Sequence, residues 1–182
     1  MDRFRTSLLL LLVVFLALWK PVSARAAGDE DPASAAAIRA LTSDDPVANQ
    51  VAAVPADFGY RPAGTRYAVD PDGGCSSPIA LPAVFDEPCK AHDLGYDLLR
   101  YAAAKGHPLG PWARELLDST FDRRLHTACL LRSGLERVSC AATAEVASAA
   151  VRVNTWRQHA GVPVPETAGE IAGSFVLAAV RR

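Results

Sequence analysis

Three long segments in the second half of the chain have the apolar spacing of amphipathic helices. The first, Asp86–Ala104, opens on a good N-cap residue and stops before Gly106. The second runs from Pro111 to about Arg132, where Gly134 ends it, and the third runs from about Val138 to His159. The short Gly- and Pro-containing connection between the first two predicts that they pack as antiparallel neighbours.

Apolar residues repeat at helical spacing in the second and third segments, which predicts one buried face on each. We expect these faces to contain Trp112, Leu117, Phe121, Leu125 and Ala128 in the second helix, and Val138, Ala142, Val146, Ala149, Val153 and Trp156 in the third. The sequence shows neither a convincing alternating strand pattern nor an internal repeat. The expected fold is therefore all-α.

The first half of the chain is less regular. Residues 27–50 are acidic and Ala-rich, and we interpret them as a loosely attached leader with one short helix near Ser34–Leu41. Val51–Phe58 resembles a further helical piece, whereas Tyr60–Pro78 is rich in Gly and Pro and is expected to be loop. The main helical domain should then span residues 51–162.

Both ends of the chain carry apolar runs. Residues 1–26 have a basic start, an apolar run of about 18 Å if helical, and small residues near position 24, so we interpret them as a secretory signal peptide. An uncleaved membrane anchor is the alternative, although a bilayer core is about 30 Å thick. The tail, residues 163–182, contains the apolar run Ile171–Val180, which either packs as a terminal helix or lies at a membrane surface.

The formal net charge is −1, which leaves no overall basic character to attract nucleic acid. The chain has four cysteines, all after the predicted signal peptide. An even number of cysteines in an exported chain indicates disulfides, and four allow three connectivities. The simplest is sequential, Cys75 with Cys89 and Cys129 with Cys140, and each bond would close a short loop.

The most informative stretch for function is Cys89-Lys90-Ala91-His92-Asp93-Leu94-Gly95-Tyr96. On a helix, His92 and Asp93 lie about 100° apart and can flank one cleft. The imidazole can then act as a base and the carboxylate as a metal ligand. A bare His-Asp dipeptide is more often a solvated pair on a helix surface, so the neighbouring residues decide between these interpretations.

Asp118 supplies the missing partner. It lies at the border of the apolar stripe on the second helix, and antiparallel packing can place it across from His92. A carboxylate that accepts one ring N–H fixes the imidazole tautomer and leaves the other nitrogen free as a base.

These residues resemble the bacterial and fungal secreted phospholipase A2 family. The Cys-x-x-His-Asp-x-Gly-Tyr run matches from Cys89 to Tyr96, and an Asp-Ser-x-Phe run matches at Asp118–Phe121. Cys129 and Cys140 continue the pattern, so the resemblance covers roughly residues 72–140. It implies a small disulfide-stapled helical domain in which two antiparallel core helices carry the active site.

The resemblance also implies a calcium-dependent hydrolysis of the sn-2 ester of glycerophospholipids. His92 would activate water, Asp118 would orient His92, and Asp93 would be a Ca²⁺ ligand. The protein would be a secreted, extracellular monomer that acts on a phospholipid membrane surface. The alternatives are a non-catalytic secreted lipid- or protein-binding member of the same fold, and a stapled structural domain without an active site.

One position departs from the family pattern. Its members place a second calcium-binding aspartate two residues before the first cysteine, where this chain has Gly73, and Asp72 lies one residue earlier. We predict that the glycine lets Asp72 swing in as a ligand, with the carbonyl of Gly74 as another. Asp70 is the next candidate, and weak or absent calcium binding is the alternative outcome.

Overall fold

A computed structural model describes residues 30–50, 53–77, 80–167, 169–171 and 173–174. This part of the chain is mainly helical, as the sequence predicts, and its β structure is one isolated bridge between Ala63 and Val69. The helices are α2 (Pro32–Thr42), α3 (Pro46–Gln50), the 3-10 turn η1 (Ala83–Phe85), α4 (Asp86–Ala104), α5 (Pro111–Cys129) and α6 (Gly134–Arg157). The all-α prediction is confirmed.

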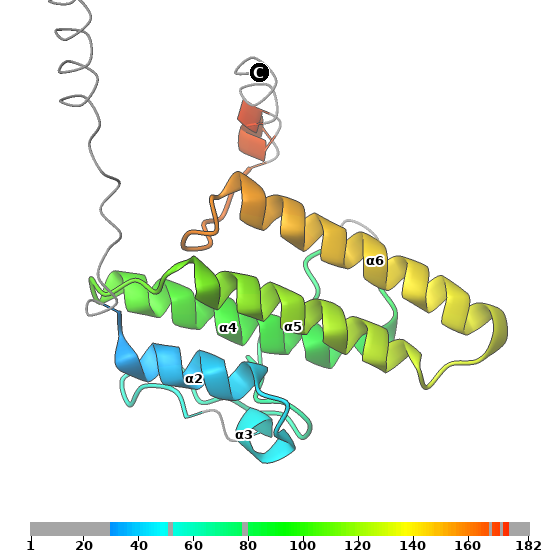
Figure 1. Cartoon of the computed structure of the whole chain (residues 1–182), viewed down its shortest axis with the longest axis horizontal. Helices are drawn as coiled ribbons and strands as arrows, with labels where there is room; N and C mark the ends of the chain where they lie inside the picture. Colours follow the sequence, from blue (N-terminus) through cyan, green and yellow to red (C-terminus); the bar gives the residue numbers. More distant parts are fainter. Residues whose placement is uncertain (1–29, 51–52, 78–79, 168, 172, 175–182) are drawn as a thin grey trace, which may run out of the picture.

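The three long helices stack in sequence order. Figure 1 shows α4 and α5 side by side and running in opposite directions, with α6 against α5 on one side and α2 with α3 on the other. Gly95 of α4 allows the close approach of α5, because a Cβ at this position would lie 2.2 Å from Cδ2 of Leu117. The antiparallel pair expected from the short connection is therefore present.

The bounds of α4 are as predicted, and those of the next two helices differ. The turn η1 leads into α4, so Phe85 is its N-cap and Asp86 is its first residue. α5 ends at Cys129, residues 130–133 turn the chain into α6, and the disulfide from Cys129 to Cys140 links the two helices across this turn. Gly134 does not end a helix. It begins α6 with a φ of 54°, in the left-handed region that glycine tolerates.

The described part of the segment interpreted as a loose leader, residues 30–50, packs on the other helices, so that interpretation is wrong for these residues. α2 packs on α4 and α5, and Ile38 and Leu41 are fully buried. The N-cap Asp31 accepts a hydrogen bond from Ser34 N–H. Glu30 Oε1 accepts hydrogen bonds from the Gly110 N–H at 2.7 Å and the Trp112 indole N–H, which fasten the start of α2 to the turn between α4 and α5.

The expected buried face of α6 is also wrong, whereas that of α5 is largely confirmed. On α5 the buried apolar residues include Leu117, Phe121, Leu125 and Ala128, and Trp112 is half-buried. On α6 the apolar stripe faces solvent, with exposed fractions from 43% for Val153 to 86% for Leu135. The side that packs on α5 consists of small residues instead, namely Cys140, Ala144, Ser148 and Thr155.

Two hydrophobic clusters make up the interior. One joins α2 to the adjoining parts of α4 and α5, and the other surrounds Phe85 and both disulfides. Within the described ranges, none of the helices is long and apolar enough to cross a membrane. The predicted signal peptide, residues 1–26, and most of the tail run Ile171–Val180 lie outside the described residues.

Candidate active site

Both disulfides pair as predicted, Cys75 with Cys89 and Cys129 with Cys140. The first joins the loop after Val69 to the first turn of α4, with 5.1 Å between the two Cα atoms. The loop also binds α4 through the backbone, since Asp70 N–H donates to the carbonyl oxygen of Lys90. These links hold residues 70–75 beside the turn of α4 that carries His92 and Asp93.

His92 and Asp118 meet between α4 and α5. Nε2 of His92 lies 2.9 Å from Oδ1 of Asp118, and the two side chains are 9% and 5% exposed. A carboxylate oxygen accepts, so Nε2 carries the hydrogen and Nδ1 keeps its lone pair. The ring packs against Tyr96 and Phe121, with centroid distances of 4.1 and 4.7 Å. These contacts fix both the orientation and the tautomer of the imidazole.

Asp118 is also held by residues that the sequence analysis did not assign to the site. Tyr96 donates its hydroxyl to Oδ1 at 2.9 Å, and Thr155 of α6 donates its hydroxyl to Oδ2. Burial, followed by the charge of Asp118, raises the pKa of Tyr96 to about 12, so the phenol remains a donor. Arg114 fixes the position of the Thr155 hydroxyl, because its Nε–H donates to Oγ1 of Thr155 at 2.9 Å.

Asp93 lies on the neighbouring side of α4 and faces the disulfide-linked loop. Its Oδ2 accepts the Gly74 N–H at 2.8 Å. Burial raises the pKa of Asp93, the Gly74 N–H and His92 oppose the shift, and Asp70 and Asp97 add to it. A Cβ at Gly73 would lie 2.9 Å from Oδ2 of Asp93 and 3.1 Å from Oδ2 of Asp70, so both carboxylates border the space above that glycine.

The predicted calcium ligands are therefore brought together only in part. Gly74 lies against Asp93, although the contact is through its N–H rather than its carbonyl. Asp72 is exposed, and its backbone N–H binds Oδ1 of Asp70. Throughout the described ranges, no three His, Cys, Asp or Glu side chains form a group that could hold a metal. The pair Asp70 and Asp93 has the oxygen donors that suit a hard cation, which would compensate two neighbouring negative charges.

A cavity of about 750 Å³ opens between α5 and α6, on the side of Asp118 that faces Thr155 rather than His92. Asp118 and Thr155 belong to its wall, and Trp156 and His159 line it at the end of α6. The lining residues belong to α5, to α6 and to the turn that follows α6 (His159 and Ala160), so the cavity reaches the Asp118–Thr155 bond rather than the His92 ring.

A comparison with protein-family models finds no match for this chain, and neither does a comparison with curated proteins. The interpretation of the site therefore depends on its own geometry and on the resemblance of its residues to the secreted phospholipase A2 pattern.

Proposed function

We propose that this protein is a secreted phospholipase A2 that hydrolyses the sn-2 ester of glycerophospholipids. The observation that carries the proposal is the buried hydrogen bond between Nε2 of His92 and Oδ1 of Asp118. It gives a general base with a fixed tautomer, next to a carboxylate on the adjacent residue of the same helix. This is the set of groups that the resemblance assigns to ester hydrolysis by an activated water.

In this proposal His92 accepts a proton from water at Nδ1 while Nε2–H remains bonded to Asp118. Asp118 stabilises the resulting imidazolium as a positioning residue. The hydroxyl groups of Tyr96 and Thr155 keep both oxygens of Asp118 in place, so the imidazole does not need to reorient during turnover. The Phe121 and Tyr96 rings restrict the imidazole to one plane.

Calcium is the proposed cofactor, held by Asp93 with Asp70 or Asp72 and the backbone at Gly74. When bound, a calcium ion polarises an ester carbonyl and stabilises the negative charge that develops on its oxygen. The raised pKa of Asp93 and its proximity to Asp70 support a cation at this position.

The proposed partner is a phospholipid surface, and the exposed apolar stripe of α6 supports it. The outer helix α6 exposes five large apolar residues over about 32 Å of its length, namely Leu135, Val138, Val146, Val153 and Trp156. An exposed apolar strip of this length is typical of surfaces that bind membranes or proteins. The absence of free cysteines among the described residues fits an oxidising environment outside the cell.

Fatty-acid release from phospholipid vesicles, measured with calcium and with a chelator, tests the proposal. We expect His92→Ala to lower turnover by roughly 10²–10⁴, because it removes the proton acceptor, while circular dichroism shows that the fold is retained. His126→Ala is the matched control, since His126 is a half-buried histidine elsewhere on α5. Equal activity of the His92→Ala and wild-type proteins would refute the mechanism.

A non-catalytic lipid- or protein-binding role is the second candidate. The contact that favours it is the Gly74 N–H on Oδ2 of Asp93, which occupies an oxygen that the proposal assigns to calcium. The same assay separates the two, because a binding protein would bind vesicles without releasing fatty acid.

A further inference from the structure

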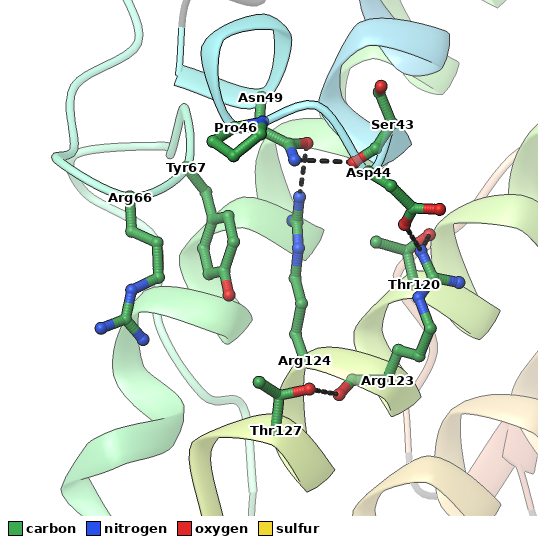
Figure 2. A pocket seen from close by; sticks show the side chains of 10 residues that line it. All are labelled: Ser43, Asp44, Pro46, Asn49, Arg66, Tyr67, Thr120, Arg123, Arg124 and Thr127. Carbon is green, nitrogen blue, oxygen red and sulfur yellow. Dashed lines mark hydrogen bonds and ion pairs between the residues drawn. The ribbon is translucent and has the colours of Figure 1, made fainter. Parts of the chain in front are cut away.

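The face of α5 opposite Asp118 carries a second cavity, of about 300 Å³. It is bounded by α5, the segment that contains α3, and the loop at residues 66–67 (Figure 2). Three arginines line it, Arg66, Arg123 and Arg124, against one lining carboxylate, Asp44. The cavity therefore has a local positive charge on a protein whose formal net charge is −1.

Arg124 forms the floor of this cavity, and only 8% of its surface is exposed to solvent. Its Nη2 donates to the carbonyl of Leu41 and to Oδ1 of Asn49, and its guanidinium lies 3.8 Å from the centroid of the Tyr67 ring. These partners are neutral. Burial lowers the pKa of Arg124 to about 10. Tyr67 and the Glu87 carboxylate act in the opposite direction and raise this pKa.

The contacts of Arg124 leave part of its guanidinium available. A guanidinium has five N–H donors, and both structural bonds use Nη2. Within the part of the chain that the structure describes, Nε and Nη1 make no hydrogen bond, and neither atom is completely buried. Asn49 keeps the side chain in this orientation, because its own Nδ2 donates to the carbonyl of Ser43 at 2.7 Å (Figure 2).

The other two arginines are less constrained. Nη2 of Arg123 donates to Thr120 at 3.2 Å and lies 3.6 Å from Asp44, whose side chain is 97% exposed. Such an exposed ion pair contributes little and exchanges readily. Figure 2 shows Tyr67 between Arg66 and Arg124, with Arg123 on the other side of Arg124.

We infer that this cavity binds a phosphate group, with Arg124 at its base and Arg66 and Arg123 at its sides. Planar guanidinium groups match the oxygens of a phosphate in pairs, and a buried arginine with neutral partners gains most from such an anion. The phosphate is either free inorganic phosphate or the phosphate of a lipid headgroup. The inference does not depend on the proposed ester hydrolysis, because Asp118 and His92 lie on the other side of α5.

Titration calorimetry with inorganic phosphate, at constant ionic strength maintained by chloride, tests the free ligand. We expect saturable binding by the wild-type protein, weakened about tenfold by Arg123→Gln and by Arg66→Gln, each of which removes a charged donor. Arg137→Gln is the matched control, because Arg137 is an exposed arginine of α6, and it should bind as the wild type does. Arg124→Lys keeps the charge and removes the fork, so phosphate binding should fall at least tenfold while circular dichroism shows an unchanged fold.

The lipid arm uses neutral vesicles with and without phosphatidic acid. Stronger binding to the phosphatidic acid vesicles, lost in Arg66→Gln and Arg123→Gln but not in Arg137→Gln, would assign the site to a headgroup phosphate. The inference is overturned if neither phosphate nor phosphatidic acid binds, or if Arg137→Gln weakens binding as much as Arg123→Gln does. Neither the phosphate titration nor the vesicle experiment measures hydrolysis, so the phosphate site can be confirmed even if the protein has no esterase activity.

Discussion

At the scale of single residues, Asp118 accepts hydrogen bonds from three side chains on two other helices: His92, Tyr96 and Thr155. An asparagine at this position offers one acceptor oxygen in place of two. The imidazole would then lose its fixed tautomer, since an amide nitrogen next to Nε2 favours the wrong one.

We therefore expect Asp118→Asn to lower turnover on phospholipid by roughly 10²–10⁴ and to leave KM nearly unchanged, because in the proposed mechanism this carboxylate acts by positioning His92 and stabilising its imidazolium form. Steady-state kinetics on dispersed substrate checks both values. Asp122→Asn, one turn along α5, is the control and should retain most of the activity. A loss confined to KM would mean that Asp118 does not act through His92.

The two candidate calcium ligands of the loop can be separated in the same way. Asp70 shares the space above Gly73 with Asp93, whereas Asp72 is exposed. We expect Asp70→Asn to raise the half-saturating calcium concentration about tenfold or more, and Asp72→Asn to raise it less, since affinity increases with the number of charged ligands. Calcium titration by calorimetry and by activity measures both. If Asp72→Asn raised the half-saturating calcium concentration more than Asp70→Asn did, Asp72 would be the ligand, as the sequence predicts.

The residues of the site that were predictable share a local signal. His92 and Asp93 are adjacent in a motif, and Asp118 follows from the antiparallel arrangement of two helices joined by a short turn. Thr155 and Arg114 carry no such signal. A threonine on the third helix reaches Asp118 only because α6 packs on α5 through small residues, and sequence spacing alone assigned the opposite face of α6 to the core.

At the scale of elements, the close contact between α4 and α5 sets the distance from His92 to Asp118. A Cβ at Gly95 would meet three atoms of the buried Leu117 side chain, at 2.2 to 3.1 Å. Because Leu117 is 3% exposed, it cannot move away without shifting its neighbours.

Gly95→Ala should therefore destabilise the protein by about 1–3 kcal/mol through overpacking, and lower turnover by separating the two helices. Denaturant unfolding measures the first effect. Leu117→Ala in the same chain should relieve the clash, so the double variant should lose less stability than the sum of the single losses. Additive losses would show that the two positions do not limit the helix spacing.

A helix end can be predicted from the sequence when the residues that terminate the helix lie next to that end in the chain. α4 ends as predicted because Gly106 adopts a φ of 82°, which follows from its own sequence. α5 stops at Cys129, before the apolar residues Leu130 and Leu131, which are exposed in the turn to α6, so helical periodicity does not reveal this end. The role of α2 in the core was missed for a related reason: an acidic, Ala-rich composition does not reveal that Ile38 and Leu41 have a partner surface on α4 and α5.

At the scale of the whole molecule, α6 forms an outer layer (Figure 1), and its larger apolar residues are exposed to solvent. If this face binds phospholipid, the paired substitution Val138→Glu and Val146→Glu should reduce partitioning into vesicles by about tenfold or more, since each adds a charge that resists burial. Hydrolysis of a dispersed short-chain substrate should change little.

Ala36→Glu is the matched control, because Ala36 is an exposed apolar position on α2, on the opposite side of the α4–α5 pair. Vesicle co-sedimentation measures partitioning, and light scattering of the wild-type protein shows whether it is the predicted monomer. A dimer that Val138→Glu and Val146→Glu dissociate would assign the α6 face to self-association instead.

The connectivity of the disulfides bears on how the chain matures. Each cysteine is bonded to its immediate neighbour among the four, over sequence separations of 14 and 11 residues. As a chain emerges from a ribosome or a translocation channel, an oxidant that joins successive thiols in order of arrival would produce the native bonds directly. A disulfide isomerase has no non-consecutive pair to form, so oxidative maturation of this protein should need an oxidase alone.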